Sequence, residues 1–172
     1  MEDGAVGLVI GPDSSDSEPR ADPPGAEAAF DTFCRESYQP MVRLAFLLTS
    51  SIETAEDLVQ DVLARTQPKW SKVDEPAAYV RRAVVNACNS HHRRRRRERQ
   101  HPLPEPEPSR MHADELFDVL ADLPARMRAA VVLRYYEDLP ENDIAALLGC
   151  APGTVRSLVH RGLARLRLVI EA

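Results

Sequence analysis

The sequence predicts an all-α protein of two small helical domains joined by a Pro-rich linker, the second a four-helix domain with a helix-turn-helix. Aromatic residues make up only 5% of the 172 residues, whereas sheet-rich folds draw more heavily on aromatic and β-branched side chains. Apolar residues recur with helical spacing in both halves of the chain. Between these halves, prolines alternate with other residues, which removes amide donors and prevents a helix.

Domain boundaries follow the shifts in composition. Residues 1–26 are rich in glycine, proline, aspartate and serine and lack periodicity, which predicts a disordered acidic leader. Residues 102–109 contain the alternating prolines and are expected to form a semi-rigid linker. The helical domains then occupy residues 27–101 and 110–172, and because each is small, marginal stability and mutual mobility are expected.

The first two helices are predicted from apolar spacing and a capping motif. Residues 28–49 have helical periodicity, and Pro40 predicts a kink or break within them. Ser50 followed by Glu53 has the form of a capping box, which predicts a second helix over residues 52–67.

The third helix is expected to be capped by Asp74 and to contain Pro76 in its first turn. One half of it is apolar and is expected to be buried: Tyr79, Val80, Ala83, Val84, Ala87 and Cys88. The opposite side carries a narrow polar row: Arg82, Asn86, Asn89 and Arg93. Five consecutive arginines, 93–97, end the helix, and arginine with asparagine suits phosphates and base edges. A solvated face with a basic tail and a nuclear-localisation signal are the alternatives.

The second domain has the pattern of a helix-turn-helix. Helices are predicted over these ranges: 112–123, 124–136, 140–148 and 152 to the C-terminus, with a turn at 149–151. The last helix has a buried arc: Val155, Leu158, Val159, Leu163 and Leu166. Its free arc holds the residues that a recognition helix places in the major groove: Arg156, Ser157, His160 and Arg161. A packing motif without a DNA role is the alternative, and Gly162 is expected to cost this helix about 1 kcal/mol relative to alanine.

Charge and composition exclude several classes of protein. The net charge is −5, yet residues 76–101 hold eight arginines against one glutamate and residues 150–172 hold four arginines against one glutamate. Two such bands suit contact with a polyanion at two separate places. No segment approaches the length of a membrane span, and the acidic start is unlike an export signal, so a cytoplasmic protein is expected.

The sequence also predicts no enzyme, cofactor or metal site. It offers no nucleophile–base pair, metal-ligand set or phosphate loop. The three cysteines are far apart and are expected to be reduced, with Cys88 acting as a small buried hydrophobe.

The order of elements and four local strings resemble the extracytoplasmic-function (ECF) subfamily of bacterial sigma-70 family RNA polymerase sigma factors. The strings are residues 55–62 (AEDLVQDV), 79–86 (YVRRAVVN), 123–124 (LP) and 143–157 (DIAALLGCAPGTVRS). The resemblance covers about residues 28–170, and it implies a region 2-like first domain and a region 4-like second domain.

The resemblance assigns roles to three sets of residues. One set resembles the segment that docks on the clamp helices of the polymerase β′ subunit: Glu56, Asp57, Leu58, Gln60 and Asp61. A second set matches the surface that meets the −10 element as its strands separate: Tyr79, Arg82, Asn86, Asn89 and Arg93. A third set matches the reader of the −35 element: Thr154, Arg156, Ser157, His160 and Arg161, with Arg134 on the DNA backbone.

The resemblance therefore implies a sigma factor that binds RNA polymerase core, directs promoter-specific DNA binding and assists promoter melting. Its expected partners are the polymerase core, through the β′ clamp helices and the β flap, promoter DNA and an anti-sigma factor. A polymerase-independent helix-turn-helix regulator is the alternative, and an Arg-rich RNA-binding protein is a third possibility.

Overall fold

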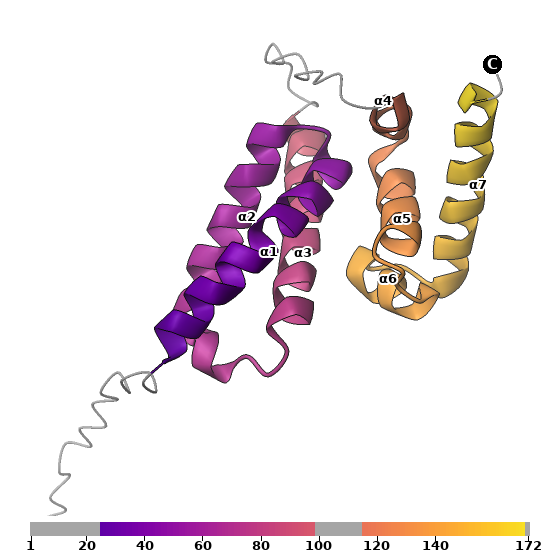
Figure 1. Cartoon of the computed structure of the whole chain (residues 1–172). Helices are drawn as coiled ribbons and strands as arrows, with labels where there is room; N and C mark the ends of the chain where they lie inside the picture. The colour runs from indigo at the N-terminus through magenta and orange to yellow at the C-terminus, as the bar shows by residue number, and fades with distance from the viewer. Residues whose placement is uncertain (1–24, 99–114, 171–172) are drawn as a thin grey trace, which may run out of the picture.

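The structure, a computed structural model, describes residues 25–98 and 115–170 (Figure 1). Within these residues the chain forms seven α-helices and one 3-10 helix and no strand, which confirms the predicted all-α class. No helix among them combines the length and the hydrophobicity that a membrane span requires. Residues 1–24 and 99–114 lie outside the described part, so the leader and the linker stay predictions.

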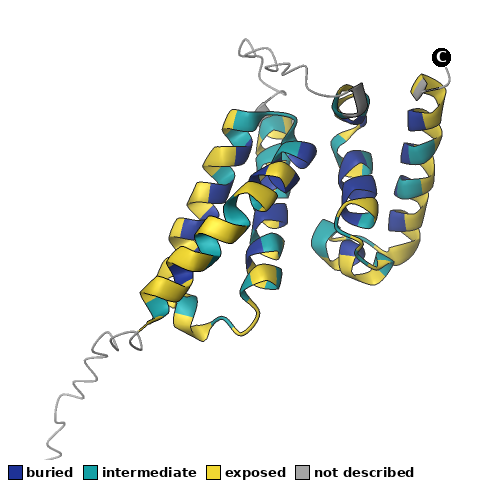
Figure 2. Ribbon diagram, viewed as in Figure 1, coloured by how far each residue is buried: buried dark blue, intermediate teal, exposed yellow. Residues whose placement is uncertain are grey.

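The first helical unit comprises α1 (Ala26–Thr49), α2 (Ile52–Thr66), the 3-10 helix η1 (Gln67–Lys72) and α3 (Pro76–Glu98). Its helices bury their apolar sides against one another, with Leu44, Val59 and Val84 fully enclosed (Figure 2). The Trp70 ring of η1 closes one end of this core, since its centroid lies 5.1 Å from that of Phe30. Hydrophobic burial thus fixes which side of α3 can face outward.

Helix α1 continues through Pro40, so the predicted break is absent. Proline at this position removes one backbone hydrogen bond, which would have ended at the carbonyl of Glu36. Both residues are exposed. Water can therefore satisfy the freed carbonyl, and the helix tolerates the loss.

The cap of α2 is Ser51, and the prediction of Ser50 is wrong. The Ser51 side chain accepts a hydrogen bond from the Thr54 amide at 3.3 Å. Ser50 instead ends α1 in a left-handed conformation with φ 60°, and its N–H donates to the Phe46 carbonyl at 2.7 Å. One residue therefore closes the first helix and the next one opens the second.

The second helical unit comprises α4 (Glu115–Ala121), α5 (Ala125–Tyr135), α6 (Glu141–Leu148) and α7 (Pro152–Ile170). Helices α6 and α7 form the predicted helix-turn-helix. Gly149 ends α6 with φ 60°, a conformation that glycine adopts without steric penalty. The Cys150 amide donates to the Ala145 carbonyl at 3.0 Å, which tightens the turn before α7 begins at Pro152.

Gly162 allows α7 to lie close against α5. A Cβ atom at this position would stand 2.6 Å from Cγ2 of Val131, which is itself buried. A β-branched side chain inside a packed core has little room to move away. The residue that looks costly for helix propensity is therefore required by helix packing.

The two units meet at the C-terminal end of α1. Arg128 of α5, only 5% exposed, donates from Nε and Nη2 to the Leu48 carbonyl at 3.2 and 2.9 Å. Its Nη1 donates to the Ala121 carbonyl at 2.9 Å. Nearby, the rings of Phe46 and Phe117 join α1 to α4 with centroids 5.5 Å apart. Units that the sequence predicts to be mutually mobile are thus in contact in the structure.

His92 of α3 shares the Leu48 carbonyl, with Nε2 at 2.9 Å. This geometry requires a proton on Nε2, so a positive charge arises only when Nδ1 is protonated as well. Burial lowers the pKa of His92 below its usual value, and the Arg128 guanidinium lowers it further, although the bond to Leu48 opposes them. The junction therefore favours a neutral imidazole.

Replacing Gly162 with alanine should destabilise the protein. Forcing a methyl group into a packed core costs about 1–3 kcal/mol, which exceeds the gain in helix propensity of about 1 kcal/mol. Urea denaturation measures the free energy of unfolding. The control is the same change in a Val131→Ala background, where the clash is relieved and Gly162→Ala should be neutral or stabilising; equal destabilisation in both backgrounds would contradict this packing account.

Acidification should destabilise the protein through His92. Because the pKa is lowered in the folded state, the unfolded chain binds more protons once the pH falls below about 6.5. The stability that neutral His92 contributes to the folded state is therefore fully present above that pH, and it is lost as the pH falls toward the folded-state pKa. Thermal unfolding from pH 8 to pH 5 tests this against His92→Gln, which keeps an N–H donor but does not titrate. The stability of the wild type relative to this variant should decrease as the pH is lowered. Parallel profiles of the two proteins would refute the role given to His92.

Candidate nucleic-acid and polymerase interfaces

The first candidate interface is the α3 face, defined as Tyr79, Arg82, Asn86, Asn89 and Arg93. Four of these side chains are exposed, and Asn89 is half-buried. The other side of α3 packs into the core, with Val80, Val84, Val85 and Cys88 at most 1% exposed. The apolar side thus orients the helix so that its row of polar side chains lies at the surface.

Tyr79 belongs to this exposed face, and its predicted place in the buried half is wrong. Tyr79 is 38% exposed, whereas Val85, which is not among the residues predicted for the buried half, is fully buried. The Lys69 ammonium lies 5.5 Å from the Tyr79 ring centroid, a distance suited to a cation–π contact. The ring is therefore held at the surface beside a positive charge.

The second unit covers one edge of the α3 face. The Asn89 Nδ2 donates to the Leu147 carbonyl of α6 at 3.3 Å. On the same side, Arg81 Nη1 and Glu137 Oε2 form an ion pair at 3.1 Å. Asn86 stays exposed, so the face is partly open in this arrangement.

The arginine run occupies the last turns of α3. Arg93, Arg94, Arg96 and Arg97 are exposed and Arg95 is half-buried. Cations are favourable at the C-terminal end of a helix, where the backbone carbonyls carry partial negative charge. The run therefore extends the α3 face as a concentrated positive surface suited to phosphates.

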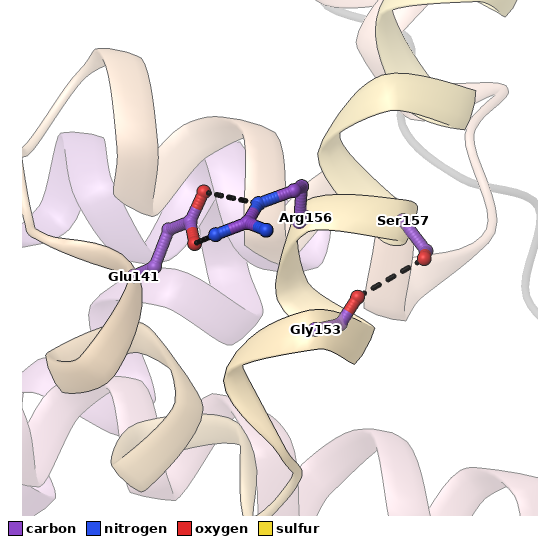
Figure 3. A network of polar contacts seen from close by, with 4 residues as sticks. All are labelled: Glu141, Gly153, Arg156 and Ser157. Carbon is purple, nitrogen blue, oxygen red and sulfur yellow. Dashed lines mark hydrogen bonds and ion pairs between the residues drawn. The ribbon is translucent and has the colours of Figure 1, made fainter.

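The second candidate interface is the α7 face, defined as Thr154, Arg156, Ser157, His160 and Arg161. All five residues are exposed in the N-terminal half of α7, opposite the buried Val155 and Leu158. The Ser157 hydroxyl donates to the Gly153 carbonyl at 3.0 Å (Figure 3). Arg161 Nε donates to the Ser157 carbonyl at 3.2 Å. The Ser157 and Arg161 side chains thus bond to the backbone of their own helix while remaining at the surface.

Arg156 is held differently, by a carboxylate of the neighbouring helix. Its Nη2 lies 2.8 Å from Oε2 of Glu141, and its Nε donates to Oε1 at 3.3 Å, so the contact is bidentate (Figure 3). The hydrogen bond and charge of Arg156 lower the pKa of Glu141, and Glu141 in turn raises the pKa of Arg156. Glu141 is not among the site residues predicted from the sequence, because nothing in the sequence indicates that side chains 15 residues apart meet across the turn.

Arg134 of α5 is half-buried, and its charge helps lower the pKa of Glu141, the partner of Arg156. Arg134 Nη1 donates to the Leu139 carbonyl at 3.0 Å, which braces the connection between α5 and α6. The structure therefore shows a structural contact for Arg134, and its role on the DNA backbone remains a prediction.

The third candidate interface is the α2 face, defined as Glu56, Asp57, Leu58, Gln60 and Asp61. Its polar members are exposed, and Leu58 is half-buried. Gln60 Nε2 donates to the Tyr38 hydroxyl at 3.3 Å, and Asp61 pairs with Arg65 one turn away. The result is an acidic surface with an apolar edge.

Comparisons with known proteins agree with this layout. Two family profiles match the chain: Sigma-70 region 2 over residues 34–98 and Sigma-70, region 4 over residues 113–166. An RNA polymerase sigma-E factor of Streptomyces coelicolor is 36% identical over 153 residues, which cover 83% of this chain and 86% of that protein. The ECF RNA polymerase sigma factor SigM of Mycobacterium tuberculosis is 32% identical over 151 residues, covering 83% of this chain and 77% of that protein.

A solved structure is similar as well. It is the co-crystal structure of the sigma factor RpoE in complex with the anti-sigma factor NepR from Bartonella quintana. The TM-score is 0.65 at 26% identity, covering 84% of this chain and 98% of that chain.

Proposed function

The chain belongs to the sigma-70 family of RNA polymerase sigma factors, in its extracytoplasmic-function group, and from this premise we propose how its surfaces perform that function. It binds RNA polymerase core, directs it to promoter DNA and assists strand separation. The observation that carries the proposal is that two exposed basic faces, on α3 and on α7, lie in different helical units. Each face can then contact a separate promoter element.

The α7 face reads the −35 element in the duplex. The N-terminal part of a recognition helix enters the major groove, where an arginine can donate two hydrogen bonds to O6 and N7 of guanine. Arg156 and Arg161 are the candidates for such a contact. Ser157 and His160 are placed between them to meet base edges or phosphates.

The α3 face engages the −10 element as its strands separate. An exposed aromatic ring can stack on an unpaired base, and an asparagine amide can pair with the edge of a base that has left the duplex. Tyr79 and Asn86 are exposed for these roles. The adjoining arginine run neutralises phosphates and supplies affinity that does not depend on sequence.

Asn89 can join this contact only after a rearrangement. Its amide donates to the Leu147 carbonyl, so α6 occupies part of the surface that DNA would need. We infer that docking on polymerase moves the second unit away from α3, which frees Asn89 and sets the spacing of the two faces. Weak binding of free DNA follows, because two sites gain avidity only when their separation matches the target.

The α2 face contacts the polymerase. Its acidic side chains and the apolar edge at Leu58 suit a helix-on-helix interface with the β′ clamp helices. The second unit contacts the β flap. The polymerase performs the chemistry, and the chain itself is a non-catalytic specificity subunit of the cytoplasm. By analogy with the RpoE–NepR complex, an anti-sigma factor is a further partner.

Charge reversal on the α2 face should weaken capture by the polymerase. Asp57→Lys should lower retention of core RNA polymerase by about tenfold, since it places a like charge against a basic partner surface. Pull-down with immobilised chain measures the effect. Glu36→Lys on α1 is the matched control and should leave retention unchanged. A wild-type chain that retains no core polymerase would instead indicate a polymerase-independent regulator.

The two basic faces should respond differently to loss of an arginine. Arg156→Ala should cost about 1–3 kcal/mol at one −35 position and relax the preference there. Arg96→Ala should weaken binding to all sequences and reduce the slope of log K against log salt by about one. Filter binding of the holoenzyme to promoter variants at several salt concentrations separates the two effects. A base-specific effect of Arg96→Ala would contradict the assignment of the arginine run to phosphates.

A further inference from the structure

We propose that Glu141 is a positioning residue for base recognition: it holds Arg156 so that the free edge of its guanidinium is directed at a guanine of the −35 element. The inference rests on the function proposed above and adds a specificity-determining role on α6. No residue of this helix is otherwise assigned to DNA.

The hydrogen bonds of Arg156 divide its guanidinium into two edges. Glu141 accepts from Nε and from one N–H of Nη2, which together form the side edge of the group. A guanidinium has five N–H groups in a rigid plane. Nη1 and the remaining N–H of Nη2 therefore form a second, end-on pair of donors. That pair matches the spacing of O6 and N7 on guanine, so Arg156 can bind Glu141 and guanine at the same time.

Fixing the arginine before it meets DNA favours discrimination. An exposed arginine side chain has many rotamers, and ordering them on binding opposes the contact. The Arg156 side chain is 75% exposed, so surrounding atoms alone do not restrain it. The bidentate contact with Glu141 supplies the restraint. It also directs the planar fork to one position in the groove, which a contact with phosphate would not require.

Arg161 provides an internal contrast on the same helix. Its Nε donates to the backbone carbonyl of Ser157 and leaves its orientation set by α7 alone. Arg156 is instead tied to α6, so its position depends on the crossing of the two helices of the helix-turn-helix. Arg156, the more strongly restrained of the two arginines, is therefore better suited than Arg161 to select one base over the others.

The negative charge of Glu141 also affects DNA binding, and this electrostatic effect can be measured separately from the positioning effect. The Glu141 carboxylate lies in the first turn of α6, where negative charge is favourable. The hydrogen bond and charge of Arg156, together with the charge of Arg134, lower its pKa. A negative charge close to DNA repels phosphates of every sequence. Removing the charge should therefore raise overall affinity, whereas removing the positioning contact should lower discrimination. Asp143 lies in the same first turn, is exposed, and serves as a control for charge alone.

The test is selection from a library of duplexes with a randomised upstream segment, using full-length chain with core RNA polymerase. Glu141→Gln should reduce the preference for guanine at one position about three- to tenfold and leave other positions unchanged, while binding of unrelated duplex increases. Asp143→Asn should increase binding of unrelated duplex without altering any preference. In an Arg156→Ala background, Glu141→Gln should no longer change base preference.

Three outcomes would overturn the inference, and the first two can be told apart from the third. If the wild-type holoenzyme selects a sequence and Glu141→Gln keeps every preference, or if Glu141→Gln and Asp143→Asn behave alike, the positioning role of Glu141 fails and the sigma function stands. If the wild-type holoenzyme selects no sequence, the proposed function itself fails, and the role of Glu141 fails with it.

Discussion

The arrangement of this protein depends on one backbone carbonyl, that of Leu48 near the C-terminal end of α1. It accepts hydrogen bonds from Arg128 of the second unit and from His92 of the first, so α1, α3 and α5 converge on a single oxygen. Carbonyls in the last turn of a helix lack intrahelical partners and carry partial negative charge. This explains how a guanidinium can be buried there with carbonyl partners. Because a buried charge is expensive to desolvate, the contact contributes more to specificity than to stability, which suits the proposed opening of this junction.

The consequence of this junction is that the two basic faces are unequal. All five residues of the α7 face are exposed, whereas the Asn89 amide of the α3 face is bonded to the Leu147 carbonyl of α6, which covers one edge of that face. In the proposed function, a free chain in this arrangement presents the face assigned to the −35 element while the face assigned to the −10 element is still incomplete. The proposed movement of the second unit would couple promoter recognition to polymerase docking, since it both frees α3 and sets the distance between the faces. On this proposal, sequence-specific binding belongs to the holoenzyme and not to the chain alone.

Features that depend on local chemistry could be predicted from the sequence, and features that depend on distant partners could not. Gly149 and Pro152 mark the turn of the helix-turn-helix, and the apolar half of α3 determines which side of that helix is polar. By contrast, Arg128 resembles any surface arginine in the sequence, because its partners Leu48 and Ala121 are brought to it only by packing. Glu141 and Arg156 meet because α6 crosses α7 at a particular angle. Gly162 weakens a helix by its intrinsic propensity, and its role in packing becomes clear only when the structure places it against Val131.

Run-off transcription shows whether this chain gives RNA polymerase a promoter preference through two separated faces. Core RNA polymerase is incubated with fragmented genomic DNA, with and without the chain, and transcript start sites are mapped. We expect discrete starts that appear only with the chain and that lie downstream of two shared sequence elements at a constant spacing. Starts that are the same without the chain, or that share only one element, would contradict it.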